Sequence, residues 1–308
     1  MEPKCNLIID SCCDLPFEIV DREWVELIKF PYFFGDEEFL DDLWQSSKPR
    51  DFYDKMRKGK QPTTAQASLV ILRDKMEHAA KLGKPTVYLC FTSGLSASFD
   101  QACMMADQIR SEYPDFELYV VDTLLASTGE ALLVLEALRQ QERGLTAKEM
   151  ADWAEEARNF INVYFMVEDL ESLHRGGRIP NSVAVVGAKL DVKPILTIPA
   201  DGTIAVKGVA RGRKKGLKQL AQMYFDRVDQ SASSYVCVGN ADCEKDMKRL
   251  EEIIAKEGYT PVFVEGTIGP VIGSHVGPGM VSLVFWGPDK RETLSVADRI
   301  ARKVRGKN

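Results

Sequence analysis

The sequence predicts an α/β protein of two domains, and three observations lead to this prediction. The chain has 308 residues, about twice the length of an average domain. Residues 1–160 alternate short apolar runs with amphipathic stretches, which is typical of parallel strands joined by helices. Residues 161–308 include two strands with a hairpin signal between them, so their sheet is expected to be mixed. We expect an N-terminal α/β domain over 1–160 and a C-terminal α/β domain over 161–308.

The first half should form a parallel sheet flanked by helices. Thr146 and Glu149 make a capping box, which predicts that a helix begins there and continues to about Asn159. Strands that alternate with helices form a sheet covered on both faces. The apolar pattern predicts strands at 6–10, 25–34, 86–91 and 117–121 and helices at 68–82, 97–112 and 127–141.

The second half has a different character. The pair Asp201-Gly202 favours the turn of a hairpin between strands at 194–198 and 203–209. Segment 169–180 shows no regular pattern, and a glycine-rich segment precedes the last strand. The remaining pattern predicts strands at 163–167, 235–238, 260–265 and 280–285 and helices at 214–229, 243–257 and from Glu292 onward.

Composition narrows the class of protein. Hydrophobic residues make up 45% of the chain and charged residues 28%, as in ordinary soluble globular proteins. A net charge of −6 argues against a dedicated nucleic-acid binder. The longest uncharged stretch, 266–288, holds too many glycines and prolines for a membrane span, and the first residues do not resemble a secretory signal. We expect a cytoplasmic protein.

The cysteines and histidines do not predict a metal site. The chain has seven cysteines, without a C-x-x-C pair, and three histidines. Zinc sites use closely spaced ligand pairs, which are missing here. We therefore expect reduced, mostly buried thiols and no metal, whereas the role of the adjacent Cys12 and Cys13 stays open.

Polar side chains follow three strands of the predicted parallel sheet. Asp10 and Ser11 begin the first such segment, Thr92 to Ser98 forms the second, and Asp122-Thr123 with the helix start at Ser127 forms the third. Ligands of open α/β sheets bind beyond these strand ends, and hydroxyls at helix N-termini suit a carboxylate or a phosphate. Simple helix capping is the alternative interpretation of each segment.

The second segment also allows a different chemistry. Gly94-Leu95-Ser96-Ala97-Ser98 nearly matches the G-x-S-x-G elbow of serine hydrolases and lacks only its last glycine. His275 could serve as the base. A serine esterase or thioesterase that uses Ser96 or Ser93 with His275 is therefore the alternative function.

His275 and two basic clusters are further candidates. His275 lies among glycines on a predicted loop with nothing apolar to pack against, which favours a ligand contact. The basic clusters span 175–178 and 211–215. Glycines flank Arg178 and Arg211, so we expect both arginines to be exposed, either in docking a partner or on a solvated face.

Taken together, these motifs resemble the DegV family over nearly the full chain. Asp10-Ser11-Cys12-Cys13-Asp14-Leu15-Pro16 is similar to the family's opening motif. The other matching segments, in the family's order, are Thr64-Ala65-Gln66-Ala67-Ser68, Ser93-Gly94-Leu95-Ser96, 168–179, Lys193-Pro194-Ile195-Leu196, Arg211-Gly212-Arg213-Lys214-Lys215 and 269–279. Ala65 and Ala67 depart from the serine and proline of the family's second motif.

The resemblance implies a two-domain fatty-acid-binding protein without a cofactor and without catalysis of its own. A long-chain fatty acid would lie in a buried tunnel, with its carboxylate at Thr64, Ser93, Gly94 and His275. A separate fatty acid kinase would phosphorylate that carboxylate for phospholipid synthesis. Asp10, Ser11 and Ser96 are possible additional pocket residues, and Arg178 and Arg211 would dock the kinase. No nucleic acid and at most transient membrane contact for lipid exchange are expected.

Overall fold

The N-terminal part of the chain is built on a parallel sheet, sheet A. The structure is a computed structural model that describes residues 2–180, 191–229 and 235–293. The strand order is β2-β1-β6-β7, so β1 has β2 on one side and β6 on the other. All of its strand pairs are parallel, as predicted. Its strands are β1 (Asn6–Asp10), β2 (Val25–Ile28), β6 (Thr86–Cys90) and β7 (Leu118–Asp122).

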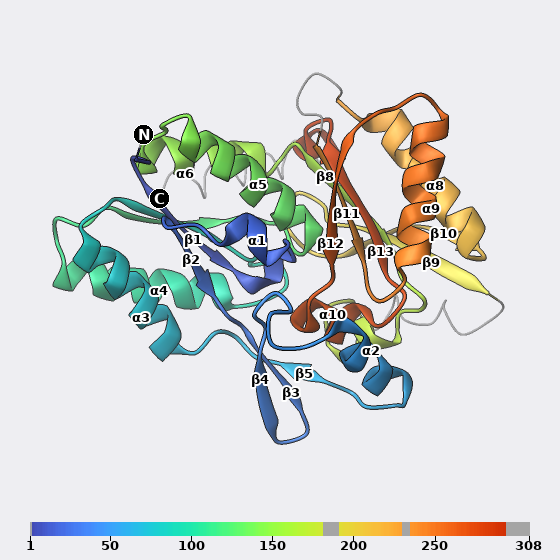
Figure 1. The fold of residues 1–308 in the computed structure, drawn as a ribbon, viewed down its shortest axis with the longest axis horizontal. Helices are drawn as coiled ribbons and strands as arrows, with labels where there is room; N and C mark the ends of the chain where they lie inside the picture. Colours follow the sequence, from blue (N-terminus) through green and yellow to red (C-terminus); the bar gives the residue numbers. More distant parts are fainter. Residues whose placement is uncertain (1, 181–190, 230–234, 294–308) are drawn as a thin grey trace.

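Helices cover both faces of sheet A (Figure 1), because its strands are apolar on both sides. The capping box predicted at Thr146 is present: its hydroxyl accepts from the Glu149 N–H, and the Glu149 carboxylate accepts from the Thr146 N–H. Two helices lie on one face, α3 (Leu69–Leu82) and α4 (Ser98–Glu112), and two on the other, α5 (Thr128–Glu142) and α6 (Ala147–Ala157).

The C-terminal part contains a six-stranded mixed sheet, sheet C. Its order is β10-β9-β8-β13-β11-β12, in which β11 and β12 are parallel and the other pairs are antiparallel. The predicted hairpin is its β9–β10 pair. Its strands are β8 (Ile161–Met166), β9 (Val192–Thr197), β10 (Ala205–Arg211), β11 (Tyr235–Asn240), β12 (Val262–Thr267) and β13 (Val281–Trp286).

Sheet C is covered unequally on its two faces. Helices α8 (Arg213–Arg227) and α9 (Glu244–Lys256) pack on one face around a separate apolar core. On the other face, α5 contacts β8, β11 and β13. Helix α5 therefore lies between sheets A and C, and most of its residues are buried, including the polar Thr128 and Glu130.

A third, small sheet joins these two parts. Sheet B has the order β4-β3-β5 and lies beside α2 and α10 (Figure 1). Its strands are β3 (Pro31–Phe34), β4 (Glu37–Leu40) and β5 (Thr63–Thr64), and α2 spans Pro49–Arg57. The short helices of the described residues are η1 (Ser11–Cys13), α1 (Phe17–Val20), α7 (Glu171–Arg175), α10 (Pro270–Val276) and η3 (Lys290–Thr293).

The structure corrects three predictions of secondary structure. The single strand predicted over 25–34 is two strands, since β2 ends at Ile28 and β3 begins at Pro31 in another sheet. Pro31 has no N–H to donate to a neighbouring strand, which favours the end of the pairing in sheet A before this residue. The irregular segment 169–180 contains α7, and the glycine-rich segment contains α10. Of the predicted terminal helix, residues 294–308 lie outside the described residues.

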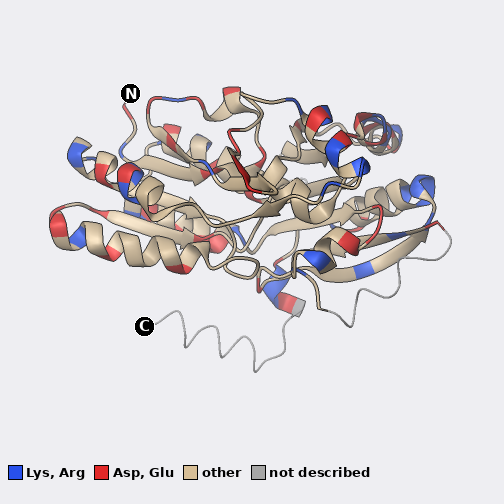
Figure 2. Cartoon of the chain, turned by 90° about the horizontal axis from the view of Figure 1, so that it is seen from below, with Lys and Arg blue, Asp and Glu red and all other residues tan. Residues whose placement is uncertain are grey.

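Charged groups lie mostly at the periphery of the molecule. Figure 2 shows acidic and basic residues interspersed along the outer helices and loops, whereas the sheets between them carry few charged residues. Within the described ranges, no helix combines the length and the apolar character needed to cross a bilayer.

Candidate functional site

A cavity of about 530 Å³ lies where the three sheets meet. This volume is within the range of small-molecule sites. Its walls come from segments that are far apart in sequence: Phe91 follows β6, Val163 and Phe165 belong to β8, Ile198 follows β9, and Ile272 belongs to α10. Most of the lining is apolar, and its polar side chains gather in a few places.

Thr64 and His275 form one of these polar places. Thr64 is held on β5 through pairing of this strand with β3, and His275 lies in the last turn of α10. Thr64 Oγ1 and His275 Nε2 are 2.8 Å apart and share a hydrogen bond. The other ring nitrogen, Nδ1, is buried and has no hydrogen-bond partner among the described residues. The structure therefore brings together two of the residues expected to hold a carboxylate.

His275 is neutral in the absence of a ligand. Burial, and then the nearby positive charges of Arg178 and Arg175, lower its pKa to about 4. A neutral imidazole has one N–H donor and one acceptor nitrogen. Because Nε2 pairs with the Thr64 hydroxyl, the unpartnered Nδ1 can donate to a ligand if it carries the proton.

The expectation that His275 lies on a flexible loop is wrong, because α10 is a helix with little free space. Pro270 occupies its first turn, where a missing N–H has no cost. A Cβ atom at Gly273 would lie 2.6 Å from the Tyr53 hydroxyl, so this glycine permits close packing against α2. Gly176 packs against Nδ1 of the His275 ring, where a Cβ atom at position 176 would overlap the ring nitrogen.

Arg178 lines the same cavity. Its side chain is half-buried, and its guanidinium donates to the backbone carbonyls of Leu95 (3.3 Å) and Gly176. No carboxylate of the described residues pairs with it, and burial lowers its pKa. The structure thus does not place Arg178 on the exposed surface that its glycine neighbours suggest.

Arg211 lies elsewhere, at the exposed end of β10. It has no ion pair within the part of the chain that the structure describes. The two arginines predicted to act together are therefore in different environments.

The serine-rich loop after β6 is divided between the cavity and the surface. Ser96 lines the cavity, and its hydroxyl is 2.7 Å from that of Ser98. Ser93 is exposed, does not line the cavity, and donates its hydroxyl to Asp122 Oδ2 at 2.5 Å. Gly94 also lies outside the lining, where a Cβ atom would be 2.5 Å from the carbonyl carbon of Gly202. Ser96 is thus better placed for a ligand than Ser93 and Gly94.

Asp10 and Ser11 are buried beneath the cavity and do not line it. Asp10 accepts from the N–H groups of Cys12 (3.0 Å) and Phe91 (2.8 Å), and the Ser11 hydroxyl accepts from the Phe30 N–H at 3.1 Å. All three donor residues line the cavity. Asp10 and Ser11 therefore hold the walls of the site in place.

The geometry of a serine hydrolase is not formed in this structure. Ser96 and His275 both line the cavity, but their polar atoms bond to Ser98 and Thr64 instead of to each other. Ser93 is hydrogen-bonded to Asp122. In the described ranges, no group of three His, Cys, Asp or Glu residues is arranged to hold a metal ion.

Sequence reasoning missed a group of buried acids beside the cavity: Asp14, Asp41 and Glu130. All three are buried, and burial is the main cause that raises their pKa values, to about 7 for Asp14 and well above the usual range for the other two. Burial and these charges also raise the pKa of the cavity-lining Cys12, which keeps the thiol protonated. Asp14 and Glu130 had a signal in the sequence, their place in polar segments after predicted strands, whereas Asp41 had none.

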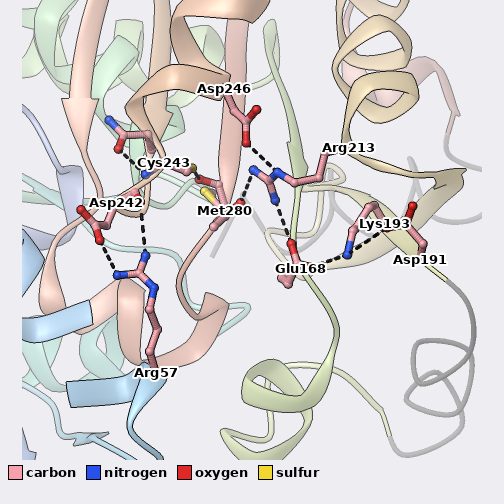
Figure 3. A network of polar contacts seen from close by, with 11 residues as sticks. Arg57, Glu168, Asp191, Lys193, Arg213, Asp242, Cys243, Asp246 and Met280 are labelled. Carbon is pink, nitrogen blue, oxygen red and sulfur yellow. Dashed lines mark hydrogen bonds and ion pairs between the residues drawn. The ribbon is translucent and has the colours of Figure 1, made fainter. Parts of the chain in front are cut away.

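A polar network also missed by sequence reasoning holds the loop after α10 (Figure 3). Arg213 donates to Asp246 Oδ2 (2.6 Å), Glu168 Oε2 (3.0 Å) and the carbonyl of Gly279 (2.8 Å). Met280 follows Gly279 and lines the cavity. Its carbonyl accepts a hydrogen bond from the Cys243 thiol. Arg213 thus has ion-pair partners, whereas Arg211 has none among the residues that the structure describes.

Comparisons with known proteins agree with this architecture. The family model described as "Uncharacterised protein, DegV family" matches residues 4–287. A DegV domain-containing protein of Clostridium perfringens is 31% identical over 287 residues, which cover 93% of this chain and 99% of that protein.

Solved structures give the same result. A DegV family protein from Thermus thermophilus, whose structure is described as fatty acid binding, superimposes with a TM-score of 0.81 at 26% identity and covers 92% of this chain and 100% of its own. The Streptococcus pneumoniae fatty acid kinase B3 protein, loaded with linoleic acid, has a TM-score of 0.80 at 18% identity and covers 92% and 99%. The chain described here belongs to the DegV family.

Proposed function

We propose that this protein binds a long-chain fatty acid in the cavity and presents its carboxylate to a separate fatty acid kinase. The observation that supports this most is the combination of an apolar cavity with three polar groups that have no acidic partner among the described residues: Thr64, His275 and Arg178. The description of the Thermus thermophilus relative as fatty acid binding gives independent support.

The head group would be held by hydrogen bonds and one positive charge. A buried carboxylate needs donors for its oxygens, since leaving them unpaired is costly. Ser96 and Nδ1 of His275 are candidate donors, and the Arg178 guanidinium supplies the charge. Thr64 would act through the imidazole: its single hydroxyl proton goes to Nε2, so that Nδ1 carries the proton of the ring. Ser93 and Gly94 would contribute only indirectly, through the loop that carries Ser96.

The acyl chain would supply most of the binding free energy. Burial of roughly sixteen methylenes at ~0.8 kcal/mol each gives a gross gain on the order of 13 kcal/mol. The costs of association and ordering reduce this gain considerably. No covalent bond is needed to retain the ligand, which suits a carrier without catalysis of its own.

A carrier needs a surface on which a partner can dock. Arg211 is exposed and has no ion pair to a described residue, so it is available for carboxylates of a kinase. The solved structure of a fatty acid kinase B3 protein with this fold motivates the choice of partner. Acyl-phosphate formed in this way would enter phospholipid synthesis.

Extraction of the purified protein tests the proposal. Mass spectrometry after native purification should detect a long-chain fatty acid in about stoichiometric amount. A fluorescent fatty acid should be displaced by the free acid far better than by its methyl ester, because the ester lacks the charge that Arg178 recognises. Absence of lipid together with hydrolysis of an acyl ester would favour the serine esterase instead.

A further inference from the structure

We propose that Asp14 and Asp41 are positioning residues for the carboxylate site: they hold the N-terminal end of α10, whose last turn carries His275. This inference rests on the proposed binding of a fatty acid carboxylate by His275. It assigns a role to two buried acids that do not contact the cavity.

Asp14 connects the start of α10 to a wall of the cavity, although the two segments are far apart in sequence. It lies just after η1, next to sheet A, whereas α10 follows the last residues of β12 in sheet C. Its Oδ1 accepts from the N–H of Gly269, the residue before α10, at 2.8 Å. Its Oδ2 accepts from the hydroxyl of Ser127 at 2.5 Å, and Ser127 lines the cavity. One carboxyl group therefore joins two walls of the site.

Asp41 approaches the same helix end from the segment after β4. It is fully buried, and its Oδ1 accepts from the Leu43 N–H at 3.1 Å. A Cβ atom added to Gly269 would lie 2.7 Å from both Asp14 Oδ1 and Asp41 Oδ2, so both acids close around this glycine. This Oδ2 is buried and has no hydrogen-bond partner among the described residues, so Asp41 acts on the helix end by packing against Gly269. Acids at this end of a helix complement its free N–H groups.

The helix transmits this position to His275. It is a short element with one turn between the acids and the imidazole, so a displacement of its first residues moves the ring as well. The hydrogen bond from Thr64 to His275 measures 2.8 Å, and a shift of about 1 Å would take it beyond hydrogen-bonding distance. The acids thus act on the ligand through His275.

A double-mutant cycle tests this role. The dissociation constant of oleate is measured by displacement of a fluorescent fatty acid for Asp14→Ala, His275→Ala and the double variant, and then for Asp41→Ala in the same way. Each aspartate substitution should raise the constant about tenfold in the wild-type background and less than twofold in the His275→Ala background. Effects that add in full would overturn the proposal.

Three controls keep the cycle decisive. Asp10→Ala removes a buried acid that contacts Cys12 and Phe91 but not α10, so its effect should be the same with and without His275. Asp14→Asn keeps an acceptor for Gly269 and should restore most of the affinity, and it replaces Asp14→Ala in the cycle if the alanine variant does not fold. An asparagine variant that folds and binds as weakly as alanine contradicts the proposal. If His275→Ala alone leaves the constant unchanged, the head-group assignment in the proposed function fails as well.

Discussion

Two polar regions adjoin the cavity: one is half-buried and carries a positive charge, and the other is fully buried and made of acids. The first, the head-group end, consists of Thr64, His275 and Arg178, and its one charged side chain has no acidic partner among the described residues. The second, the acid group, consists of Asp10, Asp14, Asp41 and Glu130, which burial makes harder to ionise.

The difference between these regions shows how a cavity can orient an anion. A carboxylate would gain a counter-charge at the head-group end, whereas the acid group near Cys12 and Ser127 offers it no positive charge. The same acids reduce stability when they lose their protons, since a buried charge is costly. Under the proposed function, the two regions would differ in role. The head-group end would bind the carboxylate, whereas Asp10 and Asp14 hold parts of the cavity wall through hydrogen bonds to Phe91 and Ser127.

The largest expected effect comes from removing the charge at the head-group end. Arg178→Ala should weaken binding of a free fatty acid by about 1.5–3 kcal/mol, the usual worth of a hydrogen bond to a charged group. Arg211→Ala, on the exposed end of β10, is the matched control and should leave lipid affinity unchanged while weakening the interaction with the kinase. Displacement titrations and kinase assays measure the two effects. Equal losses of lipid affinity would place both arginines in one site.

The acid group should make stability depend on pH. Its pKa values are raised in the folded protein, to about 7 for Asp10 and Asp14, so the folded chain binds more protons than the unfolded chain. The free energy of unfolding should therefore be highest near pH 4 and fall as the pH rises to about 8. Glu130→Gln removes one buried acid and should stabilise the protein at pH 8 by on the order of 1–3 kcal/mol.

Urea denaturation at several pH values measures this effect. The exposed Glu252→Gln on α9 is the control and should leave the curve unchanged. A stability that rises with pH, or a Glu130→Gln variant as pH-dependent as the wild type, would show that the acids are not the cause.

The smallest effect separates two serines of one loop. Ser96→Ala should weaken fatty acid binding by about 1 kcal/mol, because Ser96 lines the cavity. Ser93→Ala, whose hydroxyl faces Asp122, should change affinity by less than ~0.5 kcal/mol. Calorimetry resolves this difference. The opposite order would mean that the loop rearranges when the ligand binds.

The local features of the fold could be predicted from the sequence because they depend on neighbouring residues. The capping box at Thr146 and the alternation of strands and helices in sheet A are of this kind. Helix α10 could not be predicted in this way. Its Gly273 looks like a helix breaker in the sequence, but in the structure it gives room to Tyr53 of α2, a residue more than two hundred positions away.

The sequence predicted which residues belong to the site better than it predicted which of them are buried. Thr64 and His275 were expected to meet, and they do so at hydrogen-bonding distance. Arg178 was expected to be exposed because glycines flank it, whereas the loop after β6 covers it through the carbonyl of Leu95. Burial of a side chain depends on which distant segment packs over it, and the sequence holds no local sign of that segment.

The walls of the cavity come from β5, α10, β8 and the loops after β6 and β9, so the cavity exists only when the whole chain is folded. A molecule that occupies it binds the native state alone and shifts the folding equilibrium by mass action. A hundredfold excess over the dissociation constant corresponds to about 2.7 kcal/mol. Under the proposed function, lipid supply and the lifetime of the protein against proteolysis would therefore be linked, since a loaded chain would spend less time unfolded than an empty one.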